Sequence, residues 1–86
     1  MKSGPVIRTS TMGLHVLQAL TLDNETLNTT EHGAYTRVGV DGVCILRSQT
    51  LEQVVGRPVI LKRELEFVMS SFQGKIRFFA DRVEWE

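Results

Sequence analysis

Apolar and polar residues alternate in several short runs of this chain, and a period of two is typical of half-buried β-strands. In the clearest run, residues 34–40, the even positions Ala34, Thr36, Val38 and Val40 can face a core. The turn dipeptide Asp41-Gly42 follows this run, and Gln73-Gly74 precedes the last run, residues 75–86. The pattern predicts a mainly β domain.

Three further segments extend this prediction. Residues 14–22 can be read as a strand or as a short helix, and the absence of a clear helix cap favours the strand. Residues 59–69 place apolar side chains on one face, broken by Arg63, and predict a long strand. Residues 75–86 change parity along their length, which a bulge near residues 80–82 would explain. Such a bulge would bend the last strand around the corner of a barrel.

The remaining segments predict a loop and one helix. Residues 23–33 are polar, hold three acidic side chains and end in glycine, as a long exposed loop would. Thr50 and Gln53 have the spacing of a helix capping box. Gly56 and Pro58 then limit this helix to two turns. The predicted order is three strands, one short helix and two strands.

The C-terminal third adds a family resemblance. Residues 56–65 read Gly-Arg-Pro-Val-Ile-Leu-Lys-Arg-Glu-Leu, and residues 74–85 read Gly-Lys-Ile-Arg-Phe-Phe-Ala-Asp-Arg-Val-Glu-Trp. This pair of segments resembles bacterial single-stranded-DNA-binding proteins, closest to the primosomal replication protein N group. The resemblance implies an OB-fold, a small five-stranded barrel with one short helix between strands three and four.

The size of the chain allows one modest core. Its 86 residues predict a single OB-fold-like domain, residues 1–86, with residues 1–12 as a candidate flexible segment. A domain this small buries only roughly 60% of its unfolded surface, so we expect a homodimer that covers Phe79 and Trp85. The single cysteine, Cys44, fits a reducing compartment, and no apolar run is long enough to span a membrane. The expected location is the cytoplasm.

Single-stranded nucleic acid is held by aromatic side chains under the bases and by cations under the phosphates. Alternation allows only one of Phe78 and Phe79 inside a barrel, so Phe78 is assigned to the core and Phe79 to the surface. The candidate nucleic-acid-binding residues are those expected to point outward: Tyr35, Arg37, Lys62, Lys75, Arg77 and Phe79.

The same sequence holds no pattern typical of an enzyme. His15 and His32 are separated by a polar segment, and one cysteine cannot build a Cys/His zinc site. Cys44 lies in an apolar run, which favours a buried inert thiol. The glycines form no phosphate-binding loop. We therefore expect no catalytic residues, no metal and no cofactor.

Two functions follow from these expectations. The first is a non-enzymatic module that binds single-stranded nucleic acid in DNA replication or recombination. The second is a protein–protein interaction or inhibitor protein, of phage or mobile-element type, that acts on a host factor without binding nucleic acid. Equal numbers of basic and acidic residues, ten each, suit the second function, with the acidic segment 23–31 as its contact.

Overall fold

The computed structural model describes residues 2–86, which form seven strands and three helices. Strand residues outnumber helix residues, so the predicted mainly β class is confirmed. In chain order the elements are β1 (Lys2–Arg8), α1 (Thr11–Asp23), β2 (Asn28–His32), β3 (Tyr35–Asp41), β4 (Cys44–Arg47), α2 (Ser48–Val55), α3 (Leu61–Val68), β5 (Met69–Gln73), β6 (Ile76–Phe78) and β7 (Arg82–Trp85).

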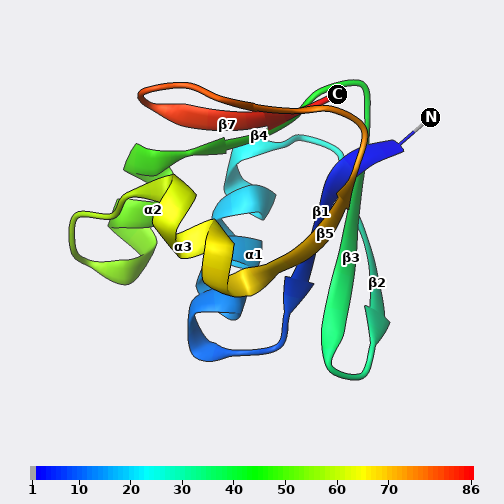
Figure 1. Cartoon of the computed structure of the whole chain (residues 1–86), viewed down its shortest axis with the longest axis horizontal. Helices are drawn as coiled ribbons and strands as arrows, with labels where there is room; N and C mark the ends of the chain where they lie inside the picture. Colours follow the sequence, from blue (N-terminus) through cyan, green and yellow to red (C-terminus); the bar gives the residue numbers. More distant parts are fainter. Residues whose placement is uncertain (1) are drawn as a thin grey trace.

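The larger sheet has four antiparallel strands in the order β2-β3-β1-β5. Figure 1 shows the three helices on one side of this sheet. The expected alternation is confirmed for Thr36, Val38 and Val40, which are buried, and for Tyr35 and Arg37, which are exposed on the opposite face. It is wrong for Ala34, which is exposed in the turn before β3, and for Gly39, which is buried. The helices therefore cover the apolar face of the sheet and leave its other face open.

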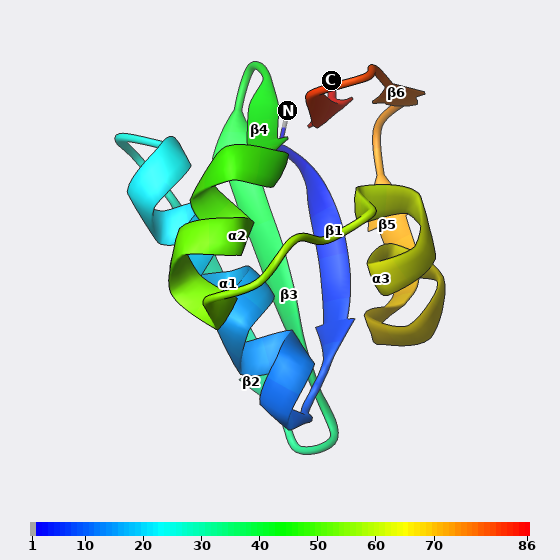
Figure 2. The ribbon, with the colours of Figure 1, turned by 90° about the vertical axis from the view of Figure 1, so that its left-hand side faces the viewer.

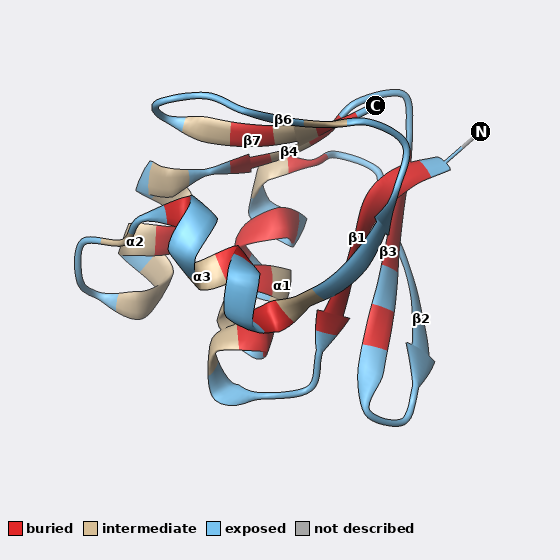
Figure 3. Ribbon diagram, in the orientation of Figure 1, coloured by how far each residue is buried: buried red, intermediate tan, exposed pale blue. Residues whose placement is uncertain are grey.

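The smaller sheet has three strands in the order β4-β7-β6 and lies across one end of the helices (Figure 1). Figure 3 shows that buried residues concentrate where the two sheets and the helices meet. Trp85, on β7, is fully buried there, and its indole Nε1 has no hydrogen-bond partner within residues 2–86. The core cluster consists of Ile7, Val16, Ala19, Leu20, Val38, Val40, Cys44, Leu46, Leu51, Leu61, Leu65, Val68, Val83 and Trp85.

The predicted five-stranded barrel is wrong. The two sheets share no strand, and each ends in unpaired edges rather than closing on itself. Three helices, where one was expected, fill the space between the sheets and bury the apolar faces that closure would have buried. Figure 2, turned by 90°, shows α1, α2 and α3 in front of the larger sheet.

Residues 14–22 form a helix, so the strand preferred for them is wrong. The helix α1 begins after Ser10, whose side chain accepts a hydrogen bond from the Gly13 backbone N–H at 2.9 Å. Gly13 also lets the helix approach β1, because a Cβ atom there would lie 2.0 Å from the Arg8 carbonyl oxygen. The buried side chains Val16 and Leu20 are spaced by one helical turn.

The long strand expected over residues 59–69 is also wrong. Residues 61–68 form α3, which buries Leu61, Leu65 and Val68. Leu61 and Leu65 are four residues apart, so they lie on the same face of a strand and also on the same face of a helix, about one turn apart. The true strand in this region is β5, which follows the helix directly.

Two further assignments change in the structure. Part of the expected loop over residues 23–33 is the edge strand β2. The last expected strand is instead the hairpin β6–β7, and residues 79–81 are its turn rather than a bulge. Phe78, assigned to the core, is 46% exposed. Phe78 and Val83 lie opposite each other on two paired strands, β6 and β7. One is an even-numbered and the other an odd-numbered position, but no bulge within a single strand is needed to explain this.

The N-terminal segment contains a strand, and the predicted helix begins two residues earlier than its capping pattern indicated. Of residues 1–12, considered a candidate flexible segment, residues 2–8 form the central strand β1, and Met1 lies outside the described residues. The helix α2 begins at Ser48 rather than Thr50, and the Thr50 hydroxyl donates to Asp23 Oδ1 at 2.6 Å. Gly56 ends this helix, as expected, with φ +77°.

Asn24 fixes the end of α1 against β4. Its side-chain Nδ2 donates to the carbonyl oxygens of Leu20 and Ile45, each at 2.8 Å. Its Oδ1 accepts from the Ile45 backbone N–H at 2.9 Å. The amide therefore hydrogen-bonds with both the N–H and the C=O of Ile45 on the outer edge of β4, as a neighbouring strand would.

Candidate protein-interaction surface

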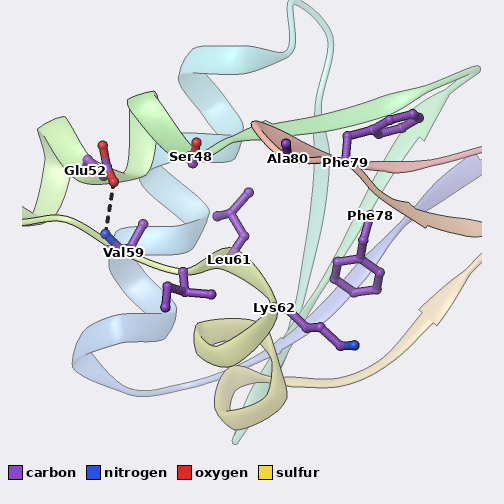
Figure 4. Close-up of a pocket in the computed structure, with 9 residues that line it drawn as sticks. Ser48, Glu52, Val59, Leu61, Lys62, Phe78, Phe79 and Ala80 are labelled. Carbon is purple, nitrogen blue, oxygen red and sulfur yellow. Dashed lines mark hydrogen bonds between the residues drawn. The ribbon is translucent and has the colours of Figure 1, made fainter.

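A cleft of about 400 Å³ opens between the α2–α3 connection and the β6–β7 hairpin (Figure 4). It combines apolar and polar side chains from parts of the chain that are distant in sequence. The lining residues are Ser48, Glu52, Val59, Ile60, Leu61, Lys62, Phe78, Phe79 and Ala80.

The connection between α2 and α3 forms one wall of the cleft. After Gly56 ends α2, Glu52 Oε2 accepts a hydrogen bond from the Val59 N–H at 3.0 Å, drawn in Figure 4. Arg57 Nη2 lies 3.7 Å from Glu64 Oε1 and links the connection to α3. These contacts hold Ile60 beside the cleft with 59% of its surface exposed.

Cations hold the two phenylalanines of the opposite wall. The Arg82 guanidinium carbon lies 4.1 Å from the centroid of the Phe79 ring, and the Lys62 ammonium lies 5.9 Å from that of Phe78. Arg82 also donates to Glu84 Oε2 at 2.7 Å and to Asp81 Oδ1 at 2.8 Å, and these hydrogen bonds raise its pKa. Phe78 and Phe79 are thereby positioned while remaining 46% and 42% exposed.

All four phenylalanines of the chain are exposed. Phe67 on α3 is 74% exposed and Phe72 on β5 is 41% exposed, in addition to the pair in the cleft. Phenylalanine is among the residues most often buried, and grouped apolar exposure marks interaction sites. Together with Ile60, these side chains place five of the nine large exposed hydrophobic residues found in residues 2–86 between positions 60 and 79.

The structure separates the six residues expected to bind nucleic acid. Lys62 and Phe79 line the cleft. Lys75 and Arg77 lie at β6, where Arg77 Nη2 is 2.8 Å from Glu86 Oε1. Tyr35 and Arg37 lie on β3 in the other sheet, and Tyr35 stacks on His32 with ring centroids 5.3 Å apart. They do not form one cationic groove with stacked aromatic side chains.

Sequence reasoning missed Ile60, Phe67 and Phe78 as surface residues. Phe67 and Phe78 were assigned to buried faces of strands that the structure replaces by a helix and a short hairpin. A helical reading of residues 61–68 would have placed Phe67 off the buried stripe formed by Leu61 and Leu65. The signal available in the sequence was the four-residue spacing of Leu61 and Leu65, which is about one helical turn.

The remaining chemistry of the described chain is limited. Cys44 is buried, as expected, and burial, with a smaller contribution from the Asp23 carboxylate, raises the pKa of its thiol to about 12. Within residues 2–86, no three His, Cys, Asp or Glu side chains are grouped closely enough to hold a metal ion. The same residues include no helix long and apolar enough to cross a membrane.

This fold and cleft define a small binding module that presents aromatic side chains to another molecule. The chain belongs to the MmoB/DmpM family, whose model matches residues 2–86. It is 33% identical over 84 residues to the effector subunit of the alkene monooxygenase system of Xanthobacter autotrophicus, a match that covers 95% of this chain and 82% of that protein.

The fold is also found in a solved structure. A chain of the phenol hydroxylase–regulatory protein complex superimposes with a TM-score of 0.89 and 18% identity. The match covers 99% of this chain and 95% of that one. At this identity the likeness establishes the fold alone.

These comparisons settle two of the sequence predictions. The assignment to the OB-fold single-stranded-DNA-binding proteins, and with it the role in DNA replication, is wrong, because the chain belongs to a different family. The prediction that the chain is not an enzyme is confirmed, since its relative is an effector subunit of a monooxygenase system. The second function considered, protein–protein interaction, fits better than nucleic-acid binding.

Proposed function

We propose that this protein is the effector subunit of a multicomponent monooxygenase and acts by binding the catalytic oxygenase component. The proposal is supported by membership of the MmoB/DmpM family and by the relative from the alkene monooxygenase system. An effector must recognise a second protein, and the exposed phenylalanines of the cleft, Phe78 and Phe79, supply apolar surface suited to that task.

We assign the contact to the cleft and its rim. Phe78, Phe79 and Ile60 present apolar surface, and their positions are fixed by Arg82, Lys62 and the α2–α3 connection. Aromatic side chains that are already ordered lose little conformational entropy when a partner covers them. Rings at the centre of a desolvated contact commonly dominate its binding energy. Phe78 and Phe79 are therefore the expected energetic centre of this interface.

Two residues selected from the sequence, Lys62 and Phe79, belong to this proposed contact, now with a protein as the partner. Lys62 adds a cation at the rim, where it would favour an acidic residue of the oxygenase component. Tyr35, Arg37, Lys75 and Arg77 receive no role in the proposal.

The test measures binding and activity with the purified oxygenase component. The Phe79→Ala variant is titrated against that component by isothermal calorimetry, and product formation is followed as a function of the concentration of this chain. Loss of a central aromatic contact costs about 2 kcal/mol or more, so we expect the dissociation constant to rise roughly 30-fold. The concentration needed for half-maximal stimulation of product formation should rise in parallel.

Leu22→Ala is the matched control, since Leu22 is 67% exposed on α1 and does not line the cleft. We expect this variant to change affinity less than about threefold, which corresponds to a surface effect of about 0.5 kcal/mol. If the unaltered chain neither binds the oxygenase component nor changes its rate, the proposed function is wrong. If it binds but Phe79→Ala and Leu22→Ala behave alike, the assignment to the cleft is wrong.

A further inference from the structure

A second hollow, with a volume of about 220 Å³, adjoins the cleft at the α2–α3 connection. Val59 and Ile60 line both hollows, so they form the ridge between them. Residues 57–63 hold three of the ten Lys and Arg residues of the chain and no acidic residue. A partner that covers the cleft therefore meets this second hollow as well. Its lining residues are Arg57, Pro58, Val59, Ile60, Arg63 and Glu64.

The helix α3 directs neighbouring cations into different hollows. Consecutive residues of an α-helix point about 100° apart around its axis. Lys62 accordingly lines the cleft (Figure 4), and Arg63 lines the second hollow. Both side chains are exposed, because α3 turns Leu61 and Leu65 toward the core. The two hollows are parts of one surface, and each contains a cation from the same turn of α3.

The charges of the two hollows differ. In the cleft, Lys62 is accompanied by one carboxylate, that of Glu52. In the second hollow, Arg57 and Arg63 are accompanied by one carboxylate, that of Glu64. The cleft is therefore balanced in charge and lined by aromatic rings, whereas the second hollow has an excess of one positive charge.

The hydrogen-bond donors of the second hollow are largely uncommitted. Arg57 Nη1 donates to the Pro58 carbonyl oxygen at 3.2 Å, while Arg57 Nη2 lies 3.7 Å from Glu64 Oε1, which is too long for a hydrogen bond. Among residues 2–86, the Arg63 side chain makes neither a hydrogen bond nor an ion pair. A guanidinium presents several N–H donors in a planar fork that matches a carboxylate. The second hollow is therefore suited to receive a carboxylate from another molecule.

We propose that the second hollow is a carboxylate subsite of the contact with the oxygenase component, which rests on the proposed function. A segment of that component lies across Ile60 and places an apolar side chain in the cleft, against Phe78 and Phe79. An Asp or Glu side chain of the same segment enters the second hollow and accepts hydrogen bonds from Arg63. The apolar contact supplies most of the binding energy, and the cationic hollow selects partners that carry a carboxylate at the matching position.

The experiment measures the affinity of Arg63 variants for the purified oxygenase component by isothermal calorimetry. Arg63→Gln removes the charge and introduces a residue of similar helix propensity, so α3 is retained. Loss of a hydrogen bond to a charged group should raise the dissociation constant about tenfold. Arg63→Glu places a like charge against the partner's carboxylate, and the dissociation constant should rise by at least about a further tenfold.

Arg37→Gln is the matched control. Arg37 is exposed and, like Arg63, is in no ion pair within residues 2–86, but it lies on β3 and lines neither hollow. The same exchange there should change the dissociation constant less than about threefold.

Salt dependence separates the two hollows. Raising NaCl from roughly 0.1 M to roughly 1 M shortens the Debye length from about 10 Å to about 3 Å and screens a charged contact at the surface. The affinity of the unaltered chain should therefore fall with salt, and the fall should be smaller for Arg63→Gln. Phe79→Ala should bind more weakly and keep the full salt dependence, because it alters only the apolar part of the contact.

Equal changes in the dissociation constants of Arg63→Gln and Arg37→Gln overturn the carboxylate subsite. An unchanged salt dependence in Arg63→Gln overturns it as well. In both cases, weaker binding by Phe79→Ala would leave the proposed function standing. If the unaltered chain does not bind the oxygenase component at all, the proposed function is wrong and the subsite is refuted with it.

Discussion

Replacing Asn24 by alanine should destabilise the fold far more than an ordinary polar substitution. Asn24 is 9% exposed, and its side chain makes three hydrogen bonds of 2.8 to 2.9 Å. The Leu20 carbonyl keeps another partner in the variant, because the Asn24 backbone N–H also donates to it at 3.1 Å. The N–H and C=O groups of Ile45, by contrast, would lose the partner on their outer edge.

The size of the effect follows from these two orphaned groups. Leaving a buried polar group unsatisfied costs about 1–3 kcal/mol, so two partly buried groups should cost about 2–4 kcal/mol. The whole free energy of unfolding for a chain of this length is roughly 4–13 kcal/mol. Asn24→Ala should therefore lower the melting temperature by about 10 °C or more, at about 4–8 °C per kcal/mol.

Urea denaturation followed by the fluorescence of Trp85 measures this loss. Trp85 is the single tryptophan and is fully buried, so its emission reports the packed core directly. Asn28→Ala is the matched control, because Asn28 is exposed on β2 and should change stability by less than about 0.5 kcal/mol. A loss for Asn24→Ala no larger than that of the control would refute the argument that this amide substitutes for a strand.

Two further changes test other features. Gly74 has φ +90°, and an added Cβ would lie 2.5 Å from the Glu86 carbonyl oxygen, whereas Gly56 has φ +77° with open space around it. In thermal melts Gly74→Ala should therefore lose more stability than Gly56→Ala, which should lose about 1 kcal/mol; equal losses would contradict the close approach. Burial raises the pKa of the Cys44 thiol from 9.0 to about 12, so the folded state retains a proton that the unfolded chain releases. The free energy of unfolding should then fall by about 1.4 kcal/mol per pH unit between these two values, in excess of any fall in Cys44→Ala, when both are measured by urea titration.

The fold could be predicted from the sequence only where the spacing of the apolar residues fitted either a strand or a helix but not both. In β3, Thr36, Val38 and Val40 are buried, and Val38 fits no helical stripe that also holds Thr36 and Val40, so the strand and these three buried residues were predicted correctly. Ala34, also expected to face the core, is exposed in the turn before β3. In α3, Leu61 and Leu65 are separated by four residues, which is an even number and also about one helical turn. The sequence pattern alone could not distinguish the two structures there.

The candidate site was affected by the same ambiguity. Lys62 and Phe79 were selected from the sequence for contact with nucleic acid, and both line the cleft. Phe78 was placed in the core because one continuous strand was assumed, and the turn at residues 79–81 removes that assumption. The exposure of all four phenylalanines is a tertiary property, since it depends on which elements cover which faces.

The position of β1 has a consequence for how the chain folds. This strand consists of residues 2–8, yet its two neighbours in the sheet are β3 and β5, which end at residues 41 and 73. This strand must therefore wait until residue 73 has been synthesised before both of its edges are paired. Contacts so distant in sequence slow folding, and they make completion of the sheet a late, cooperative event.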